Sequence, residues 1–156
     1  MEFEQRKPSI GVETRSSSPE GSQPTPACRV ASLFIDHLNC RNFEGIGQLF
    51  EDPTDVTGPD GSMYRHPSDV VAFMSRGFEA MTTHWRFKIA NLVAVGINGC
   101  LLEFEVSEDD GPFEAVAVDH FELNADGKIV RFLPYVAANR VAKTVELQNK
   151  LKAARA

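Results

Sequence analysis

The chain lacks the features that mark a nucleic-acid-binding, membrane or secreted protein. Its 156 residues hold 16 Lys and Arg against 22 Asp and Glu, for a net charge of −6, and no stripe of basic residues is present. An acidic chain without such a stripe repels phosphates, so we expect no nucleic-acid partner. No apolar run approaches the roughly 20 residues that span a membrane. The first residues also lack the positively charged region followed by an apolar region that is typical of a secretion signal. We therefore expect no membrane partner.

Cysteine is also scarce. The chain has three cysteines, Cys28, Cys40 and Cys100, so at least one of them stays outside any intramolecular disulfide. Their spacing is not that of metal ligands. Free thiols are typical of reducing compartments. We expect a cytoplasmic protein with reduced cysteines and with no metal and no cofactor.

Residues 1–26 contain few large apolar side chains and are rich in Ser, Pro, Glu, Gly and Gln. A segment of this composition buries too little apolar surface to order itself, so we predict a disordered N-terminal tail. A phosphorylated or partner-binding tail is the alternative.

The rest of the chain predicts one domain over residues 27–141, followed by a C-terminal helix over residues 142–156. With 42% hydrophobic residues, a chain of this length can build a core. Apolar residues at helical spacing predict a helix from Ala27, a short second helix from Phe43 to Phe50, and a third that begins at Pro67. After a short extended piece at residues 55–57, the remaining pattern alternates with period two and predicts four strands from Trp85 onward.

The most informative stretch is residues 112–141, which predict two long strands joined by a turn at residues 124–127. Alternation places Ala117, Asp119, Phe121 and Leu123 on one face and His120 on the other. A lone carboxylate within a half-buried strand costs free energy unless it has a partner or a use. Asp119 is therefore the first candidate for a functional residue.

The order of elements predicts an α+β fold in which a curved antiparallel sheet wraps around three N-terminal helices. Such a sheet forms a cone with an apolar interior, which is a natural site for a small molecule.

The element order and the segment VDHFELNADGKIVRFLPYV at residues 118–136 resemble the nuclear-transport-factor-two-like superfamily. Its members include ketosteroid isomerases, SnoaL-like polyketide cyclases, limonene epoxide hydrolases and scytalone dehydratases. The resemblance covers about residues 27–141 and implies the cystatin-like α+β barrel. The fold hosts many reactions, so the resemblance alone does not choose one.

Within this resemblance, Asp119 lies where ketosteroid isomerases hold a protonated Asp that donates to a substrate oxygen. The position of their catalytic base is Gly58 here, with Asp60 two residues further on. Their phenol and supporting tyrosines correspond to Phe34, Met74 and Phe50. One catalytic group is kept and the others are absent, so the resemblance does not predict ketosteroid isomerase activity itself.

Two other members of the superfamily match less well. The epoxide hydrolases place an Asp on the last strand where this chain has Pro134. The scytalone dehydratases use two histidines inside the cone, whereas strand parity directs His84 and His120 away from it.

We select four candidate catalytic residues, each with a second interpretation. Asp119 would bind or deprotonate a ligand at its oxygenated end, or serve as a structural acid. Tyr64, His66 or Asp60 would supply the second acid–base group. Alternatively, Tyr64 is a rim aromatic, His66 a helix-entry residue and Asp60 a turn residue, as the Pro-Asp-Gly sequence favours.

A set of large apolar side chains would line the cone and contact the substrate, and several of its members could equally be ordinary core. Many aromatic rings favour a large, flat apolar ligand such as a polyketide, terpenoid or steroid-like molecule. The set is Phe34, Phe50, Met74, Phe78, Trp85, Phe87, Phe104, Ala117, Phe132 and Pro134.

Two functions of different classes follow. The first is a cofactor-free isomerase, cyclase or dehydratase that acts on a small hydrophobic substrate by acid–base chemistry. The second is a non-catalytic module for ligand binding or dimerisation. The resemblance also implies a homodimer formed through the sheet, which the sequence permits.

Overall fold

A computed structural model describes residues 24–58, 60–136 and 153. Three helices and six strands make up this part of the chain. The helices are α1 (Pro26–Cys40), α2 (Phe43–Gln48) and α3 (Pro67–Ala80), and the strands are β1 (Phe50–Thr57), β2 (Met63–Tyr64), β3 (Trp85–Val95), β4 (Gly99–Glu108), β5 (Glu114–Leu123) and β6 (Ile129–Val136). None of these helices combines the length and the apolar character that crossing a bilayer requires.

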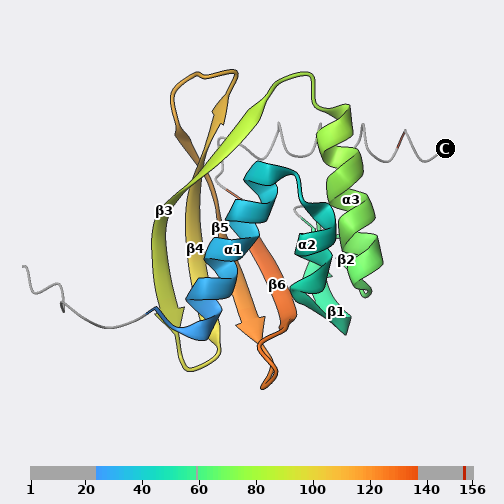
Figure 1. Ribbon diagram of the computed structural model, residues 1–156, viewed down its shortest axis with the longest axis vertical. Helices are drawn as coiled ribbons and strands as arrows, with labels where there is room; N and C mark the ends of the chain where they lie inside the picture. Colours follow the sequence, from blue (N-terminus) through green and yellow to red (C-terminus); the bar gives the residue numbers. More distant parts are fainter. Residues whose placement is uncertain (1–23, 59, 137–152, 154–156) are drawn as a thin grey trace, which may run out of the picture.

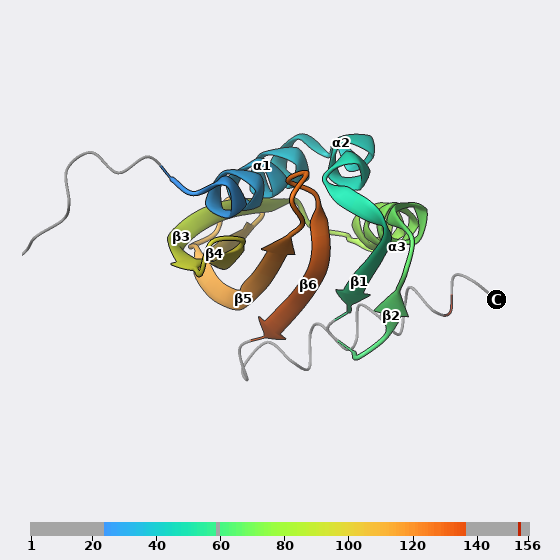
Figure 2. The same ribbon diagram turned by 90° about the horizontal axis from the view of Figure 1, so that it is seen from below.

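The six strands form one curved, unclosed sheet in the order β2-β1-β6-β5-β4-β3. Neighbouring strands are antiparallel except β1 and β6, which run parallel. Figures 1 and 2 show that the sheet curls and that the helices lie on its concave side. The predicted α+β fold is confirmed.

Local sequence signals set the limits of α1, the helix that crosses the concave face. The Thr25 hydroxyl accepts a hydrogen bond from the Cys28 amide, and Pro26 occupies the first turn. Arg41 ends the helix in a left-handed conformation with φ of 57°. The buried side of α1 carries Ala27, Cys28, Ala31, Phe34, Ile35 and Leu38, which pack against the sheet.

The second predicted helix was too long. Helix α2 ends at Gln48, and Phe50 begins a strand rather than ending the helix. Phe50 pairs with Ile129 of β6, whose amide donates to the Leu49 carbonyl at 2.8 Å. This pairing joins segments far apart in the chain, so the local pattern does not reveal it. The short strand β2 was also missed, because its two residues are too few to display an alternating pattern.

The alternation predicted for the Asp119 strand is confirmed. Asp119, Phe121 and Leu123 are buried on the concave side, and Val118 and His120 lie on the outer face. Phe121 is fully buried, and its ring lies 5.4 Å from that of Phe34 and 5.1 Å from that of Phe132. These three rings form the centre of the core.

The predictions made for the two ends of the chain are not tested by the structure. The predicted tail and the predicted C-terminal helix fall on residues outside the described part, apart from 24–26 and Ala153.

Candidate functional site

Asp119 lies on the concave face of β5 with 4% of its surface exposed. The residues on either side of it on this face of the strand are Ala117 and Phe121. Its partners on the adjacent strands are Leu102 of β4 and Pro134 of β6. All four neighbours are apolar, so the strands around Asp119 provide no side chain that could neutralise a charge.

The Asp119 carboxyl forms no hydrogen bond or ion pair with the described residues. Removal from water disfavours the ionised form, and this burial raises the pKa of Asp119 from 3.8 to about 8. The group is therefore mostly protonated at neutral pH. A neutral carboxyl can donate a hydrogen bond, and one with a pKa near neutrality can also exchange its proton during a reaction.

The strand beside Pro134 stops before it reaches the level of Asp119. The last paired residues of β1 and β6 are Val56 and Phe132, and β1 ends at Thr57. Continuing this parallel register places Gly58 beside Pro134. The buried Gly58 therefore occupies the position that the resemblance assigned to a catalytic base, and it brings no carboxylate.

Tyr64 lies on the same concave side as Asp119, at the far edge of the sheet. It pairs with Val56 of β1, is 8% exposed and packs its ring 5.0 Å from that of Phe73 of α3. Strands β1 and β6 lie between β2 and β5. In a flat sheet the distance from β2 to β5 would be about 14 Å, which is three inter-strand spacings. Curling of the sheet shortens the distance across the concave face. Tyr64 thus faces the same interior from the opposite side.

Asp60 takes part in the turn between β1 and β2. Its Oδ1 accepts a hydrogen bond from the Ser62 amide at 2.9 Å, and the Gly58 amide donates to the Ser62 carbonyl at 2.7 Å. This is the geometry of an Asx turn, in which the side chain stabilises the local backbone.

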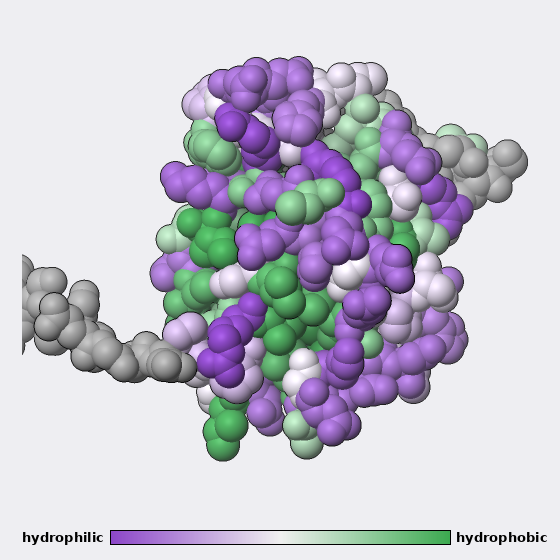
Figure 3. Space-filling view, in the orientation of Figure 1, coloured by the Kyte–Doolittle hydropathy of each residue, from purple (hydrophilic) through white to green (hydrophobic). Residues whose placement is uncertain are grey.

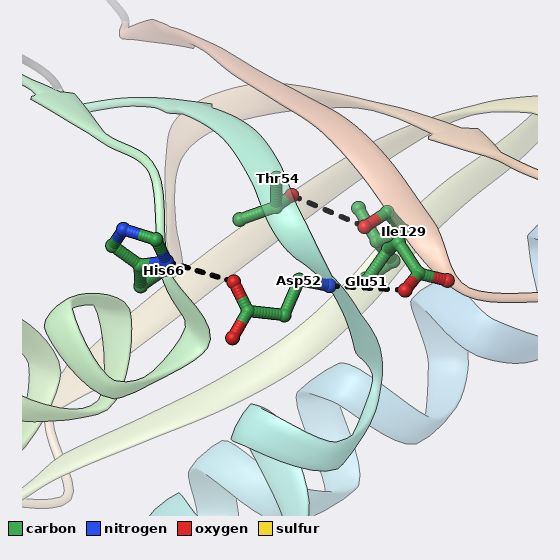
Figure 4. A network of polar contacts seen from close by, with 5 residues as sticks. All are labelled: Glu51, Asp52, Thr54, His66 and Ile129. Carbon is green, nitrogen blue, oxygen red and sulfur yellow. Dashed lines mark hydrogen bonds and ion pairs between the residues drawn. The ribbon is translucent and has the colours of Figure 1, made fainter.

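His66 lies at the exposed start of α3, where its Nδ1 is 2.7 Å from Asp52 Oδ1 (Figure 4). The side chains of both residues are more than half exposed. The hydrogen bond that the His66 ring donates to Asp52 is the main reason that the pKa of His66 is raised above 6.5. His66, a predicted acid–base partner of Asp119, is therefore paired with Asp52 at the surface. Among the described contacts, no hydrogen bond or ion pair joins His66 to Asp119.

The predicted lining residues divide into two groups. Phe34, Phe50, Phe104, Ala117 and Phe132 are at most 9% exposed and fill the core. The members that keep accessible surface are Met74, Phe78, Trp85, Phe87 and Pro134. On the helical side, Figure 3 shows apolar side chains reaching the surface between α1 and α2, on a face that is otherwise largely hydrophilic.

A chain of ring contacts connects the accessible aromatics to the neighbourhood of Asp119. The Phe87 ring lies 5.9 Å from that of Phe78 and 6.0 Å from that of Phe104. Phe104 pairs with Ala117, two residues from Asp119 on the same face. An apolar surface therefore extends from the partly exposed rings toward the buried carboxyl.

Sequence reasoning missed Arg41. Its guanidinium lies 4.1 Å from the centre of the Phe78 ring and donates to the backbone carbonyls of Leu38 and Trp85. Burial lowers the pKa of this group. Arg41 joins the end of α1 to β3 and holds two candidate lining residues in place. No local signal in the sequence marks this role.

The histidines that parity excluded from the interior lie where it predicted. His84 is exposed, and His120 lies on the outer face with its Nε2 3.7 Å from Glu122 Oε1. Neither supplies a second acid–base group on the concave side.

Comparisons with known proteins agree with this geometry. Residues 31–132 match the family model of the SnoaL-like domain. A steroid delta-isomerase from Pseudomonas aeruginosa has a TM-score of 0.67 at 16% identity, covering 86% of this chain and 98% of its own. An LEH-like epoxide hydrolase from M. tuberculosis has a TM-score of 0.59 at 18% identity, covering 84% and 97%. No curated protein matches the sequence.

A provisionally named polyketide cyclase from Pseudomonas putida is also similar. It has a TM-score of 0.56 at 17% identity, over 75% of this chain and 95% of its own. At such identities these solved structures establish the fold, which is the predicted cystatin-like cone. They do not transfer a reaction.

Proposed function

Because the chain belongs to the SnoaL-like domain family, we propose that it is a cofactor-free enzyme that acts on a hydrophobic small molecule on the concave face of its sheet. The reaction is an isomerisation, a cyclisation or a dehydration that proceeds by acid–base chemistry. The names of the similar structures, which include an isomerase and a polyketide cyclase, support this range.

The observation that carries the proposal is the buried Asp119, which has apolar neighbours on every adjacent strand. In its neutral form the carboxyl donates a hydrogen bond to the carbonyl oxygen of a bound substrate. As negative charge develops on that oxygen, the same bond strengthens, because Asp119 is almost completely removed from solvent. Asp119 then stabilises an enolate or enol intermediate by holding or transferring its proton.

Tyr64 is the second acid–base group that we favour among the predicted candidates, since it faces the interior. Asp60 serves the turn and His66 serves the surface pair with Asp52. A substrate that spans the concave face would contact Asp119 at one side and Tyr64 at the other.

The partly exposed aromatic residues indicate the class of substrate. Phe78, Trp85 and Phe87 offer flat apolar surfaces in contact with one another. Such surfaces favour a large, flat ligand of the polyketide, terpenoid or steroid type, which gains free energy by leaving water.

The test uses Trp85, which is the single tryptophan of the chain, as a reporter. Ketones of polyketide, terpenoid and steroid type are titrated while Trp85 emission and the Tm are recorded, and each is then incubated for product analysis. We expect a bound ketone to change the emission and to be converted. Asp119→Asn should reduce the turnover at least ~100-fold, whereas the exposed control Asp126→Asn should not. Turnover that survives in Asp119→Asn contradicts the proposal.

A non-catalytic binding module is the second candidate. Among the described residues, no titratable side chain forms a hydrogen bond or ion pair with Asp119, which favours this function, as do the apolar residues at the Phe34 and Met74 positions. Binding that Asp119→Asn weakens, without product formation from any ketone of the panel, would support this function over the enzyme.

We further propose that a second copy of the chain covers the outer face of the sheet. Val118 and Leu133 lie on this face with Tyr135, which is 55% exposed. Burial of these side chains between two copies would remove apolar surface from water.

A further inference from the structure

Two cysteines that are distant in the sequence meet in the core. Cys28 lies in the first turn of α1 and Cys100 near the start of β4, 72 residues apart in the chain. The Cys28 thiol donates to the Cys100 sulfur at a distance of 2.9 Å, and the two residues are 5% and 0% exposed. Both are free thiols. No step of the proposed reaction uses them.

We propose that Cys28 and Cys100 form an oxidisable thiol pair, whose product is an intramolecular disulfide that ties α1 to β4. The two sulfurs need to approach by less than about 1 Å to reach the bond length of about 2.05 Å. Their side chains already point toward one another from a helix and a strand that pack together. Oxidation would therefore preserve the fold.

The oxidant is a hydroperoxide, and the reaction occurs in two steps. The Cys28 thiolate attacks a peroxide oxygen, the O–O bond breaks, and the oxygen that leaves takes a proton, which gives a sulfenic acid on Cys28. The Cys100 sulfur then attacks the Cys28 sulfur. The S–O bond breaks, and hydroxide leaves as water with the Cys100 proton. With hydrogen peroxide, two thiols are oxidised and the peroxide is reduced to two waters.

The order of the two steps follows from position. Cys28 is the third residue of α1, and the ends of helices open more readily than their middles. Cys100 has no exposed surface, and burial, aided by the hydrogen bond with Cys28, raises the pKa of its thiol to about 12. A thiol that stays protonated reacts slowly with peroxide. Cys28 is therefore oxidised first, and Cys100 resolves the intermediate.

The crosslink would lie on the concave face, beside the strand that carries Asp119. Cys100 pairs with Phe121, which is two residues from Asp119. A covalent bond here holds α1 on the sheet at the core formed by Phe34 and Phe121. The inference is independent of the proposed reaction, because it concerns sulfur chemistry alone.

The test uses the full chain with Cys40→Ser, since Cys40 is exposed and could pair between molecules. The protein is treated with hydrogen peroxide, denatured, alkylated and weighed as an intact chain. We expect the loss of two hydrogen atoms, no alkylation, and one peptide that links Cys28 to Cys100. The Tm should rise by about 5 °C or more, and dithiothreitol should reverse every change.

Two variants serve as controls, each in the Cys40→Ser background. Cys28→Ala and Cys100→Ala should each gain oxygen atoms or remain alkylatable, and neither should gain the peroxide-dependent rise in Tm. The proposal is wrong if the peroxide-treated Cys40→Ser protein keeps two alkylatable thiols or gains oxygen without the linked peptide. This readout needs neither alanine variant to fold.

Discussion

Asp119 of β5 lies directly opposite Pro134 of β6 on the concave face of the sheet. A proline has no backbone N–H and no polar side chain, so this neighbour offers the carboxyl no hydrogen-bond donor. Strand β6 tolerates the proline here because its pairing with β1 ends at Phe132. Pro134 therefore adds no donor to the apolar residues that neighbour Asp119 on the described strands, and β1 ends beside it at Thr57.

The buried carboxyl should make stability depend on pH. The folded state holds the Asp119 proton up to a pKa of about 8, against 3.8 for an ordinary Asp. Between these values the folded state binds more protons, so the free energy of unfolding falls as the pH rises from about 4 to about 8. The Asp119 contribution to this fall is on the order of 5 kcal/mol.

Asp119→Asn should remove that contribution. Urea denaturation at several pH values should give a flatter profile for this variant, which becomes more stable than the wild type near pH 8. Asp126→Asn, at an exposed turn, should keep the wild-type profile. Parallel profiles for the wild type and Asp119→Asn would show that the carboxyl is not buried in the neutral form.

Phe121→Ala should destabilise the protein by about 3–5 kcal/mol, because it removes a fully buried ring and leaves a cavity. The lost contacts with Phe34 and Phe132 contribute to this value. Ile97 is 86% exposed, so Ile97→Ala should change stability by less than about 0.5 kcal/mol. If the wild type and Phe121→Ala unfold at the same denaturant concentration, the central position of Phe121 in the core is contradicted.

His66 should titrate above its usual value of 6.5 because Asp52 stabilises its protonated ring. The pair therefore contributes to stability at low pH, and the contribution disappears as the pH rises through the raised pKa. NMR titration of the His66 ring should show the midpoint return toward 6.5 in Asp52→Asn. Asp126→Asn, which changes an exposed turn residue, should leave the His66 midpoint at its wild-type value.

A His66 variant tests whether the His66–Asp52 pair lies outside the ligand-binding site. His66→Asn should leave ligand-induced changes in Trp85 emission unaltered, because the ring is exposed and bonded to Asp52. A loss of binding comparable to that of Asp119→Asn would place His66 in the site after all.

Tyr135→Asp should convert the proposed dimer into a monomer, since it places a charge on the outer face at a residue that is 55% exposed in the single chain. Light scattering after size exclusion measures the mass directly. Ile97→Asp, which adds the same charge at an 86% exposed turn residue between β3 and β4, is a control for charge alone. A wild-type chain that is monomeric at every concentration would rule out the proposed dimer.

Much of the fold could be predicted from the sequence because its signals are local. Alternation through Trp85, Phe87 and Ile89 and through Asp119, Phe121 and Leu123 defined two strands and their buried faces. Apolar residues at helical spacing from Ala27 marked the first helix. Each depends on residues only a few positions apart, which share a face or a turn in any fold that forms the element.

The candidate site was predicted less well. Asp119 was recognised because a lone acid breaks an apolar pattern, which the sequence displays directly. The roles of Tyr64, His66 and Asp60 could not be separated, because all three lie near one another in the chain. Folding directs Tyr64 to the interior, gives His66 a surface acid and engages Asp60 in a turn.

The sequence by itself determined that residue 119 is an acid on the apolar face of a strand, since side chains alternate wherever a strand forms. Only the tertiary structure decided what surrounds that acid. The register of β4 and β6 against β5 places Leu102 and Pro134 beside the carboxyl, and the packing of α1 on the sheet brings Cys28 against Cys100, 72 residues away. Strand register and helix packing bring these residues together, and the alternation of apolar and polar residues specifies neither.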